Sequence, residues 1–413
     1  MIRSMYSAIS GLRNHQTMMD VVGNNIANVN TTGFKSNSVV FQDVLSQTLR
    51  GAGAPAGALG GTNPAQVGLG SALGAVTTSF TQGALQRTGR ATDVAIQGDG
   101  FFNVVQAGQS LYTRAGAFSI DALGRLVTQD GAFVQGWQAD ATGAVNTNAA
   151  VGNVTIPVGA LITPNETDSI TVGGNLPADA PIAPDPGSTI VNSVDVYDQE
   201  GNPISVSITF THTAANTWTA SVATLPGGGA LDPDPSTLVF DASGELTSGN
   251  LTLTGVPNTT GGITIDLGAP GAPGRVTQFA EVNTVAVLSQ TGYGAGTLQS
   301  FTVSQEGLLV GSYSNGQTRP IGQLAMASFA NPEGLERVGG TNYRATVNSG
   351  LAQLGMAGVG GRGLLTTGSV EMSNVDLAAE FTNLIVAQRG FQANSRVVTS
   401  SDELLSELVN LKR

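Results

Sequence analysis

The chain has 413 residues, of which 11% are charged and 5% aromatic, with 56 glycines, 17 prolines and no cysteine. The length allows two to four domains, and the glycine and proline content favours short strands with many turns over a helical enzyme. The lack of cysteine excludes disulfide bonds and thiolate metal sites. No N-terminal secretory pattern and no stretch of ~18 apolar residues is present, so we expect neither a cleaved signal peptide nor membrane insertion.

The net charge of −12 is concentrated in the middle of the chain. Residues 140–290 hold 14 acidic residues against one basic residue, Arg275, so this segment carries −13 and the remainder +1. An acidic segment of this kind is expected to face water, whereas nearly neutral flanks suit packing against other protein. Because no basic patch is present, nucleic-acid binding is not expected.

The first predicted element is an amphipathic helix at the N-terminus. Large apolar side chains recur at seven-residue spacing, as expected for a helix that buries one stripe. The pattern ends before Asn28, Asn30 and Gly33, which are typical of a helix end and a following turn. The predicted stripe consists of Met5, Ile9, Leu12, Met19 and Ile26.

Turns and strands follow this helix. Residues 31–74, together with 355–371 near the other end, are predicted to form an extended linker region. Within it, residues 51–74 are low in complexity and predict an irregular or mobile loop. Residues 75–144 and 291–354 alternate apolar and polar side chains between Gly, Asn and Asp turns, which is typical of strands. We expect these two similar blocks to build one β domain.

An acidic segment, residues 145–290, separates the two blocks. It contains further strand and turn patterns, for example at 193–210, 237–255 and 261–268. We therefore expect a β sandwich or barrel inserted into the first β domain. Such an insertion would bring the two ends of the chain together.

The last predicted element is a second amphipathic helix within residues 372–413, and with residues 1–30 it would form one helical domain. Ser373 and Asn374 offer N-caps for it. The two helices can pair with each other, with copies of themselves in other subunits, or with a β core, and the pattern alone leaves these open. The second apolar stripe consists of Leu377, Phe381, Leu384, Phe391, Val398 and Leu405. The predicted fold is thus mixed, with coiled-coil-like terminal helices and mainly-β domains in a nested insertion topology.

Residues that could carry chemistry are few. Residues 358–363 match GxGxxG, but they do not link a clear strand to a helix, so a glycine loop is favoured over a dinucleotide site. His15 and His212 are the only histidines, which leaves little for a metal site or a catalytic triad. We predict no enzyme activity, cofactor or metal. The remaining carboxylates fit turn positions better than a Ca²⁺ or glycosidase site: Asp195, Asp198, Glu200, Asp232 and Asp234.

Both ends of the chain carry long, specific motifs. The N-terminal motif is SAISGLRNHQTMMDVVGNNIANVNTTGFKSNSVVFQD, and the C-terminal motif is SNVDLAAEFTNLIVAQRGFQANSRVVTSSDELLSELVNL. Together with GDGFFNV and YTRAGAFSIDALGRLVTQDG between them, these motifs resemble the flagellar rod and hook proteins of bacteria. The signature residues of the N-terminal motif include Asn24, Asn25, Asn28, Gly33 and Phe34.

The resemblance is greater to hook subunits than to distal-rod subunits, because the insert and the segment GLLVGSYSNGQTRPIGQLAMASFANPEGL look like those of the hook. It implies export through the type III apparatus without signal cleavage, and then polymerisation under a hook cap into a curved extracellular tube. That tube would join the rod to the hook–filament junction proteins and transmit motor torque in swimming. A distal-rod subunit of the basal body, or an extracellular β-rich adhesin that binds through its acidic insert, are the alternatives.

Overall fold

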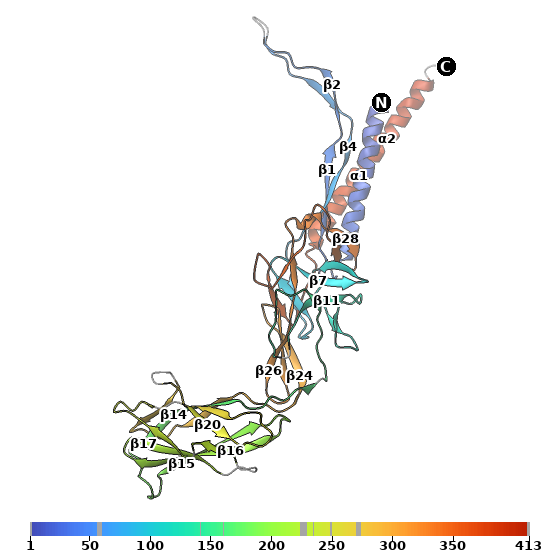
Figure 1. Cartoon of the computed structure of the whole chain (residues 1–413). Helices are drawn as coiled ribbons and strands as arrows, with labels where there is room; N and C mark the ends of the chain where they lie inside the picture. Colours follow the sequence, from blue (N-terminus) through green and yellow to red (C-terminus); the bar gives the residue numbers. More distant parts are fainter. Residues whose placement is uncertain are drawn as a thin grey trace. The chain divides into compact units, whose positions relative to one another are not determined.

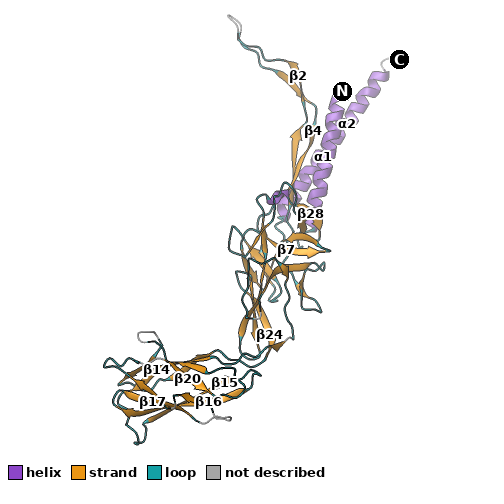
Figure 2. Cartoon of the chain, viewed as in Figure 1, coloured by secondary structure: helices purple, strands orange, loops and turns teal. Residues whose placement is uncertain are grey.

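The computed structural model describes a chain of two compact units (Figures 1 and 2). The first unit comprises residues 1–156, 301–310 and 319–413, and the second comprises 157–300 and 311–318. Asp234 and the C-terminal residues 411–413, which the sequence patterns include, lie outside the described residues. The described residues are 2–55, 60–140, 142–159, 161–223, 229–233, 235–247, 250–269 and 274–410.

The first unit contains two long helices, α1 (Ile2–Ala27) and α2 (Leu377–Asn410), which pack side by side and run antiparallel (Figure 1). Asp376, rather than the expected Ser373 or Asn374, caps α2, because its Oδ1 accepts from Ala378 N at 2.9 Å. The Asn374 side chain instead accepts a bond from Ser36 N at 2.8 Å. Neither helix in the described part of the chain is long and apolar enough to cross a membrane.

A two-stranded ribbon follows α1. Its strands are β1 (Asn37–Asp43), β2 (Ser46–Arg50), β3 (Ala65–Gly68) and β4 (Ser71–Thr78), with β1 paired to β4 and β2 to β3. The prediction of an irregular loop over 51–74 is therefore wrong for residues 65–68 and 71–74. Low sequence complexity does not prevent strand pairing, because backbone groups form the hydrogen bonds of a β ladder. Here β1 and β2 provide the facing backbone groups for β4 and β3. The ribbon is hydrogen-bonded to α1, because Asn14 Nδ2 donates to Ser71 Oγ of β4 at 2.8 Å.

The rest of the first unit is a β domain whose main sheet includes the path β26-β11-β7-β8-β29-β28. Its aromatic core is built by edge-to-face contacts, such as Phe101 with Phe80 at 5.3 Å and with Tyr343 at 5.9 Å between ring centroids. The residues of β24 (Gly296–Val303), β25 (Leu308–Tyr313) and β26 (Thr318–Leu324) divide between the two units. The other elements are β5 (Leu85–Arg87), β6 (Val94–Gln97), β7 (Phe101–Gln106), β8 (Gln109–Thr113), β9 (Ser119–Ile120), β10 (Leu126–Val127), β11 (Phe133–Gln138), β12 (Gly152–Asn153), β27 (Met326–Ser328), the 3₁₀ turn η1 (Pro332–Gly334), β28 (Glu336–Gly339), β29 (Asn342–Arg344), β30 (Gln353–Gly355), β31 (Leu364–Thr367) and β32 (Ser369–Glu371).

The second unit consists mainly of a six-stranded and a four-stranded sheet. One cluster of buried residues draws on both sheets, including Val172 and Ile265 from the first and Phe210 and Trp218 from the second. In the four-stranded sheet, alternate side chains along β17 are buried, which is the pattern of a strand with one face on a core. The strands are β13 (Leu161–Ile162), β14 (Ser169–Pro177), β15 (Thr189–Tyr197), β16 (Pro203–Ala214), β17 (Thr217–Val222), β18 (Ala230–Asp232), β19 (Ser236–Val239), β20 (Asn250–Thr254), β21 (Ile263–Asp266), β22 (Val276–Phe279) and β23 (Ala286–Gln290).

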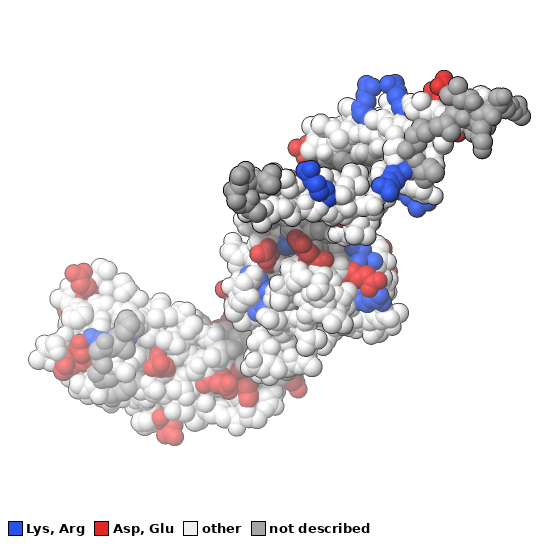
Figure 3. Space-filling model, turned by 90° about the horizontal axis from the view of Figure 1, so that it is seen from above, with Lys and Arg blue, Asp and Glu red and all other residues white. Residues whose placement is uncertain are grey.

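The expected fold class is confirmed at the level of a mostly β chain with terminal helices that pack together. The charge also divides between the units. Residues 157–300 hold 13 acidic residues and one basic residue, and 311–318 hold none, so the second unit carries −12 and the first unit is neutral. In Figure 3, acidic side chains form scattered groups over a largely uncharged surface.

A single turn design recurs in both units. In each case an Asp carboxylate accepts from the backbone N–H groups two and four residues later, and a glycine with positive φ stands three residues later. The pKa of Asp198 is lowered, chiefly by the hydrogen bond from the Asn202 side chain. The four turns begin at Asp121, Asp140, Asp198 and Asp241 and contain Gly124, Gly143, Gly201 and Gly244.

We predict that Asp198→Ala lowers the melting temperature at pH 7, because Glu200 N and Asn202 N lose an acceptor at 3.0 and 2.8 Å. Since the folded-state pKa lies below the unfolded value of about 4, this stabilisation is complete above pH ~4 and is lost as the pH falls through the folded-state pKa. Calorimetry should therefore show the difference between variant and parent narrowing below pH ~4. The control is Asp195→Ala, an exposed position on β15; an equal effect there, or a pH-independent difference, would contradict the prediction.

Candidate assembly surface

Small and polar residues line the contact between α1 and α2. A Cβ on Gly11 would lie 2.7 Å from Asn394 Nδ2, and one on Gly390 would lie 2.4 Å from the His15 ring. The two helices therefore approach closely in a fixed antiparallel register. Near the C-terminal end of α1, Asn25 Nδ2 donates to Glu380 Oε1 at 3.0 Å. Residues of the two helices that are buried in the chain include Ala8, Val22, Asn25, Ala387 and Ser401.

The predicted apolar stripes are only partly covered in a single copy of the chain. Half-buried members are Met5, Ile9, Leu12, Met19, Ile26, Leu384, Val398 and Leu405. Exposed members are Leu377, Phe381 and Phe391, whose exposed fractions are 40%, 51% and 36%. The role of these residues in contacts between subunits stays a prediction. What the periodicity missed is that Gly390 and Asn394 of α2 contact α1, at His15 and Gly11.

Further large apolar side chains on α2 are exposed as well. A helix places residues about 100° apart around its axis, so Val386, Val397 and Leu404 lie on one side of the α1 contact and Ile385 lies on the face opposite to it. One α-helix covers only one side of another, so α1 leaves both flanks of α2 uncovered. The additional exposed residues are Ile385, Val386, Val397 and Leu404.

The predicted N-terminal motif joins α1 to the β domain. Asn25 is buried, and besides its bond to Glu380 it exchanges two hydrogen bonds with the Asn37 backbone, at 2.8 and 3.0 Å. Asn28 Nδ2 donates to Asn24 O and Oδ1 and so closes the end of the helix. Gly33 has φ +69°, and a Cβ there would lie 2.5 Å from Ala115 N. Only glycine fits this turn without strain.

Phe34 and Lys35 continue this joint into the protein interior. The Arg337 guanidinium lies 4.8 Å from the centre of the Phe34 ring, a cation–π contact. Lys35 is fully buried, and its Nζ donates to Glu371 Oε1 at 2.6 Å and to Thr81 O at 2.7 Å. Sequence reasoning placed Lys35 within the motif, but the charge pair with a residue at the other end of the chain had no local signal.

Glu371 is the centre of a buried charge cluster. Its Oε1 also accepts from Gly83 N at 2.9 Å, and Arg114 Nη1 lies 3.5 Å from Oε2. Burial lowers the pKa of Lys35, opposed by its hydrogen bond with and attraction to Glu371. Burial likewise lowers the pKa of Arg114, against the attraction of Glu371. The cluster therefore links segments from both chain ends to the β domain. Burial of its charges costs desolvation free energy, which only specific, well-placed partners offset.

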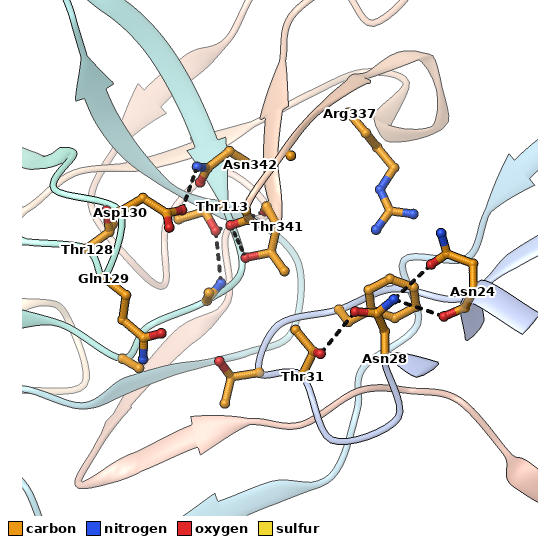
Figure 4. Close-up of a pocket in the computed structure, with 16 residues that line it drawn as sticks. Asn24, Asn28, Thr31, Thr113, Thr128, Gln129, Asp130, Arg337, Thr341 and Asn342 are labelled. Atoms are coloured by element: carbon orange, nitrogen blue, oxygen red, sulfur yellow. Dashed lines mark hydrogen bonds between the residues drawn. The ribbon is translucent and has the colours of Figure 1, made fainter. Parts of the chain in front are cut away.

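A polar cavity of about 540 Å³ lies beside this joint (Figure 4). The end of α1 contributes Asn24 and Asn28, and the β domain contributes Asp130, Arg337 and other residues. Thr31 Oγ1 donates to Asn28 Oδ1 at 3.1 Å, which fixes one wall. Asn24, Asn28 and Phe34 of the predicted motif thus line the same cavity, beside the joint between α1 and the β domain.

The other residues considered for chemistry have structural surroundings. The His212 ring stacks on Trp218 at 4.8 Å in the core of the second unit, and His15 packs against Gly390. Residues 358–363 join strands β30 and β31, so they do not have the strand-to-helix context of a dinucleotide loop. Glu200 belongs to the turn that Asp198 closes, while Asp195 and Asp232 lie on strands. Among the described residues, no cluster of His, Asp and Glu could hold a metal ion.

Family comparisons cover most of the chain. Residues 5–35 match the family described as Flagella basal body rod protein, and 366–411 match Flagellar basal body rod FlgEFG protein C-terminal. Residues 95–175 match Flagellar hook protein FlgE/F/G D1 domain, and 170–293 match Flagellar basal body protein FlaE D2 domain. The flagellar hook protein FlgE of Treponema pallidum is 40% identical over the full length of both chains. The chain belongs to the flagellar hook protein family.

Two further comparisons place this family member among its relatives. The flagellar basal-body rod protein FlgG of Bacillus subtilis is 33% identical over 414 residues, with full coverage of both chains. The crystal structure of the Helicobacter pylori flagellar hook protein FlgE2 has a TM-score of 0.53 at 14% identity, and it covers 68% of this chain and 98% of that one. This structural likeness supports the fold.

In this hook-family chain, we predict that Lys35→Met lowers the free energy of unfolding by about 3–5 kcal/mol, because Glu371 would stay buried without its closest cation. Urea unfolding followed by circular dichroism measures the change. The matched control is Arg344→Ala in the exposed pair with Glu336, at 2.7 Å, for which a cost of about 1 kcal/mol or less is expected. Equal effects of the two substitutions would contradict a special role for the buried pair.

Proposed function

We propose that the chain is the structural subunit of a flagellar hook, which polymerises into a flexible curved tube and transmits torque from rod to filament. The observation that carries this proposal is the apolar surface on α2 that α1 leaves uncovered, including Phe381 and Phe391. In a single copy this surface would face water, and further copies of the helix pair offer matching apolar flanks. The full-length similarity to proteins named flagellar hook protein supports the same assembly.

The proposal includes the partners and the location of the tube. Copies of the chain would contact one another, the rod below, a hook cap during growth, and the hook–filament junction proteins above. Export through the type III apparatus, without signal cleavage, would deliver the subunit to an extracellular structure. The neutral first unit suits dense packing in such a tube, and the acidic second unit suits exposure to water.

We further infer a nested domain arrangement. Residues 1–30 with 372–413 would form the inner helical domain, 31–74 with 355–371 a linker region, and 75–144 with 291–354 a β domain that carries 145–290 as an insert. The division of the chain, in which residues 157–300 separate two stretches of the first unit, supports this arrangement. In a nested arrangement the two terminal helices lie together, so both helices of a subunit could contribute to the same tube wall.

A distal-rod subunit is the second candidate, because the B. subtilis relative at 33% identity is named a basal-body rod protein. The higher identity to the T. pallidum hook protein, 40%, favours the hook. Electron microscopy of a deletion strain separates them, since a finished rod without a hook supports the hook subunit and a missing rod supports the alternative. The adhesin alternative requires residues 145–290 to bind a ligand while the terminal helices are dispensable.

We predict that Phe381→Glu combined with Phe391→Glu abolishes tube formation while helix content and melting temperature stay near those of the parent chain. Both rings are substantially exposed in one copy, so their replacement costs little in the isolated subunit, but a charge in a packed wall is costly. Electron microscopy after induced polymerisation measures the outcome. The matched control, Thr382→Glu with Ser400→Glu, adds the same charge to exposed polar positions of α2 and should form tubes. Normal tubes from the double Phe variant would refute the proposed role.

A further inference from the structure

The polar cavity beside the joint contains a cation whose N–H groups have no acceptor. Arg337 lies on β28 and lines this cavity of about 540 Å³. Its guanidinium lies 4.8 Å from the centre of the Phe34 ring and 5.9 Å from that of the Tyr343 ring, and it forms no hydrogen bond or ion pair with another described residue. A guanidinium held by aromatic rings presents a planar fork of N–H groups, which matches a carboxylate. Arg337 is therefore positioned to bind one.

A carboxylate lies on another wall of the same cavity. Asp130 is exposed, and its Oδ2 accepts from Asn342 Nδ2 at 3.5 Å. A Cβ on Gly340 would collide with this carboxylate, so the hairpin tip packs closely against it. Figure 4 shows Arg337 and Asp130 well apart, and within the described part of the chain they form no ion pair with each other. The cavity thus presents one positive and one negative group that do not neutralise each other.

The hairpin between β28 and β29 adds a strained residue to the cavity wall. Its two central residues are Gly340 and Thr341, with φ of +57° and +60°. Positive φ is unfavourable for a β-branched residue, and glycine is the usual choice at the second position of such a turn. Thr341 nevertheless occupies it and lines the cavity, and its carbonyl accepts from Thr113 Oγ1 at 3.1 Å. Backbone strain of this kind is concentrated at ligand sites, which supports a binding role for the cavity.

The rest of the lining favours a small polar ligand. Apart from Arg337 and Asp130, every lining residue is uncharged, and most carry an amide or a hydroxyl group. The Asn28 amide is fixed in advance, because its Nδ2 donates to Asn24 Oδ1 at 2.8 Å and its Oδ1 accepts from Thr31. Pockets for small molecules have volumes of about 300–1,000 Å³. The size and polarity of this cavity therefore suit a ligand as large as a dipeptide.

We propose that the cavity binds a small zwitterion of dipeptide size. The carboxylate of the ligand binds the Arg337 fork, and its ammonium group binds Asp130. A ligand with a single charge leaves one of these two groups without a counter-charge, and inorganic phosphate is repelled by Asp130. The site lies within one copy of the chain and does not require a tube, so this inference goes beyond the proposed hook function.

The first test compares three ligands that differ in charge. Isothermal titration calorimetry of the unassembled full-length chain measures binding of glycylglycine, N-acetylglycylglycine and glycylglycinamide. We expect glycylglycine to bind, and each analogue to bind about tenfold or more weakly, because each lacks one charge-assisted hydrogen bond. No binding of glycylglycine at millimolar concentration, or equal affinity for the three ligands, would overturn the proposal.

The second test changes the two charged side chains. Arg337→Gln and Asp130→Asn should each weaken glycylglycine binding by about tenfold or more. The matched control is Arg344→Gln, which removes an arginine of β29 outside the cavity lining and should keep the parent affinity. Asp130 is exposed, so the melting temperature of Asp130→Asn should equal that of the parent and a loss of binding there is not a loss of fold. Parent-like affinity in Asp130→Asn, or in a folded Arg337→Gln protein, would overturn the site.

These outcomes are separate from those of the hook proposal. Failure of the parent chain to form tubes would overturn the hook function without changing the calorimetric result. Conversely, absence of glycylglycine binding would leave the exposed apolar surface of α2 and its proposed role in assembly as they are.

Discussion

The buried carboxylate of Glu371 is the constraint on which the first unit depends. A charge without water must be paired and hydrogen-bonded, and here the partners come from Lys35, Gly83 and Arg114. Its own backbone oxygen accepts from Gly33 N at 2.8 Å. These contacts join the segment after α1, the segment before α2 and the β domain, so the two helices leave the β domain from one fixed joint.

The helix pair extends from this joint, and the register of the pair decides which of its side chains stay exposed. Gly11 faces Asn394 and Gly390 faces His15, so the helices meet along small and polar residues. The larger apolar side chains are then displaced to the flanks, where a single chain has nothing to cover them. A subunit that has a rigid joint, and whose helices leave apolar side chains exposed, is suited to a tube whose wall forms from many copies.

Outside the helices, many short turns closed by local hydrogen bonds contribute to stability. Four Asp turns close hairpins in both units, and their shared geometry explains why carboxylates such as Asp198 are needed for structure. The acidic residues of the second unit are therefore partly turn formers and partly solvated surface.

The sequence by itself determined the terminal helices, the β-rich middle, the uneven charge and the family, because periodicity, turn residues and long motifs are local signals. It also located Asn25, Gly33 and Phe34, although without their role in the joint. Only the tertiary structure decided that residues 65–74 pair within a ribbon, that Asp376 caps α2, and that Lys35 meets Glu371 across 336 positions of sequence. It also decided which stripe α1 covers, because the choice between neighbouring rows on a helix depends on how closely small residues let two backbones approach.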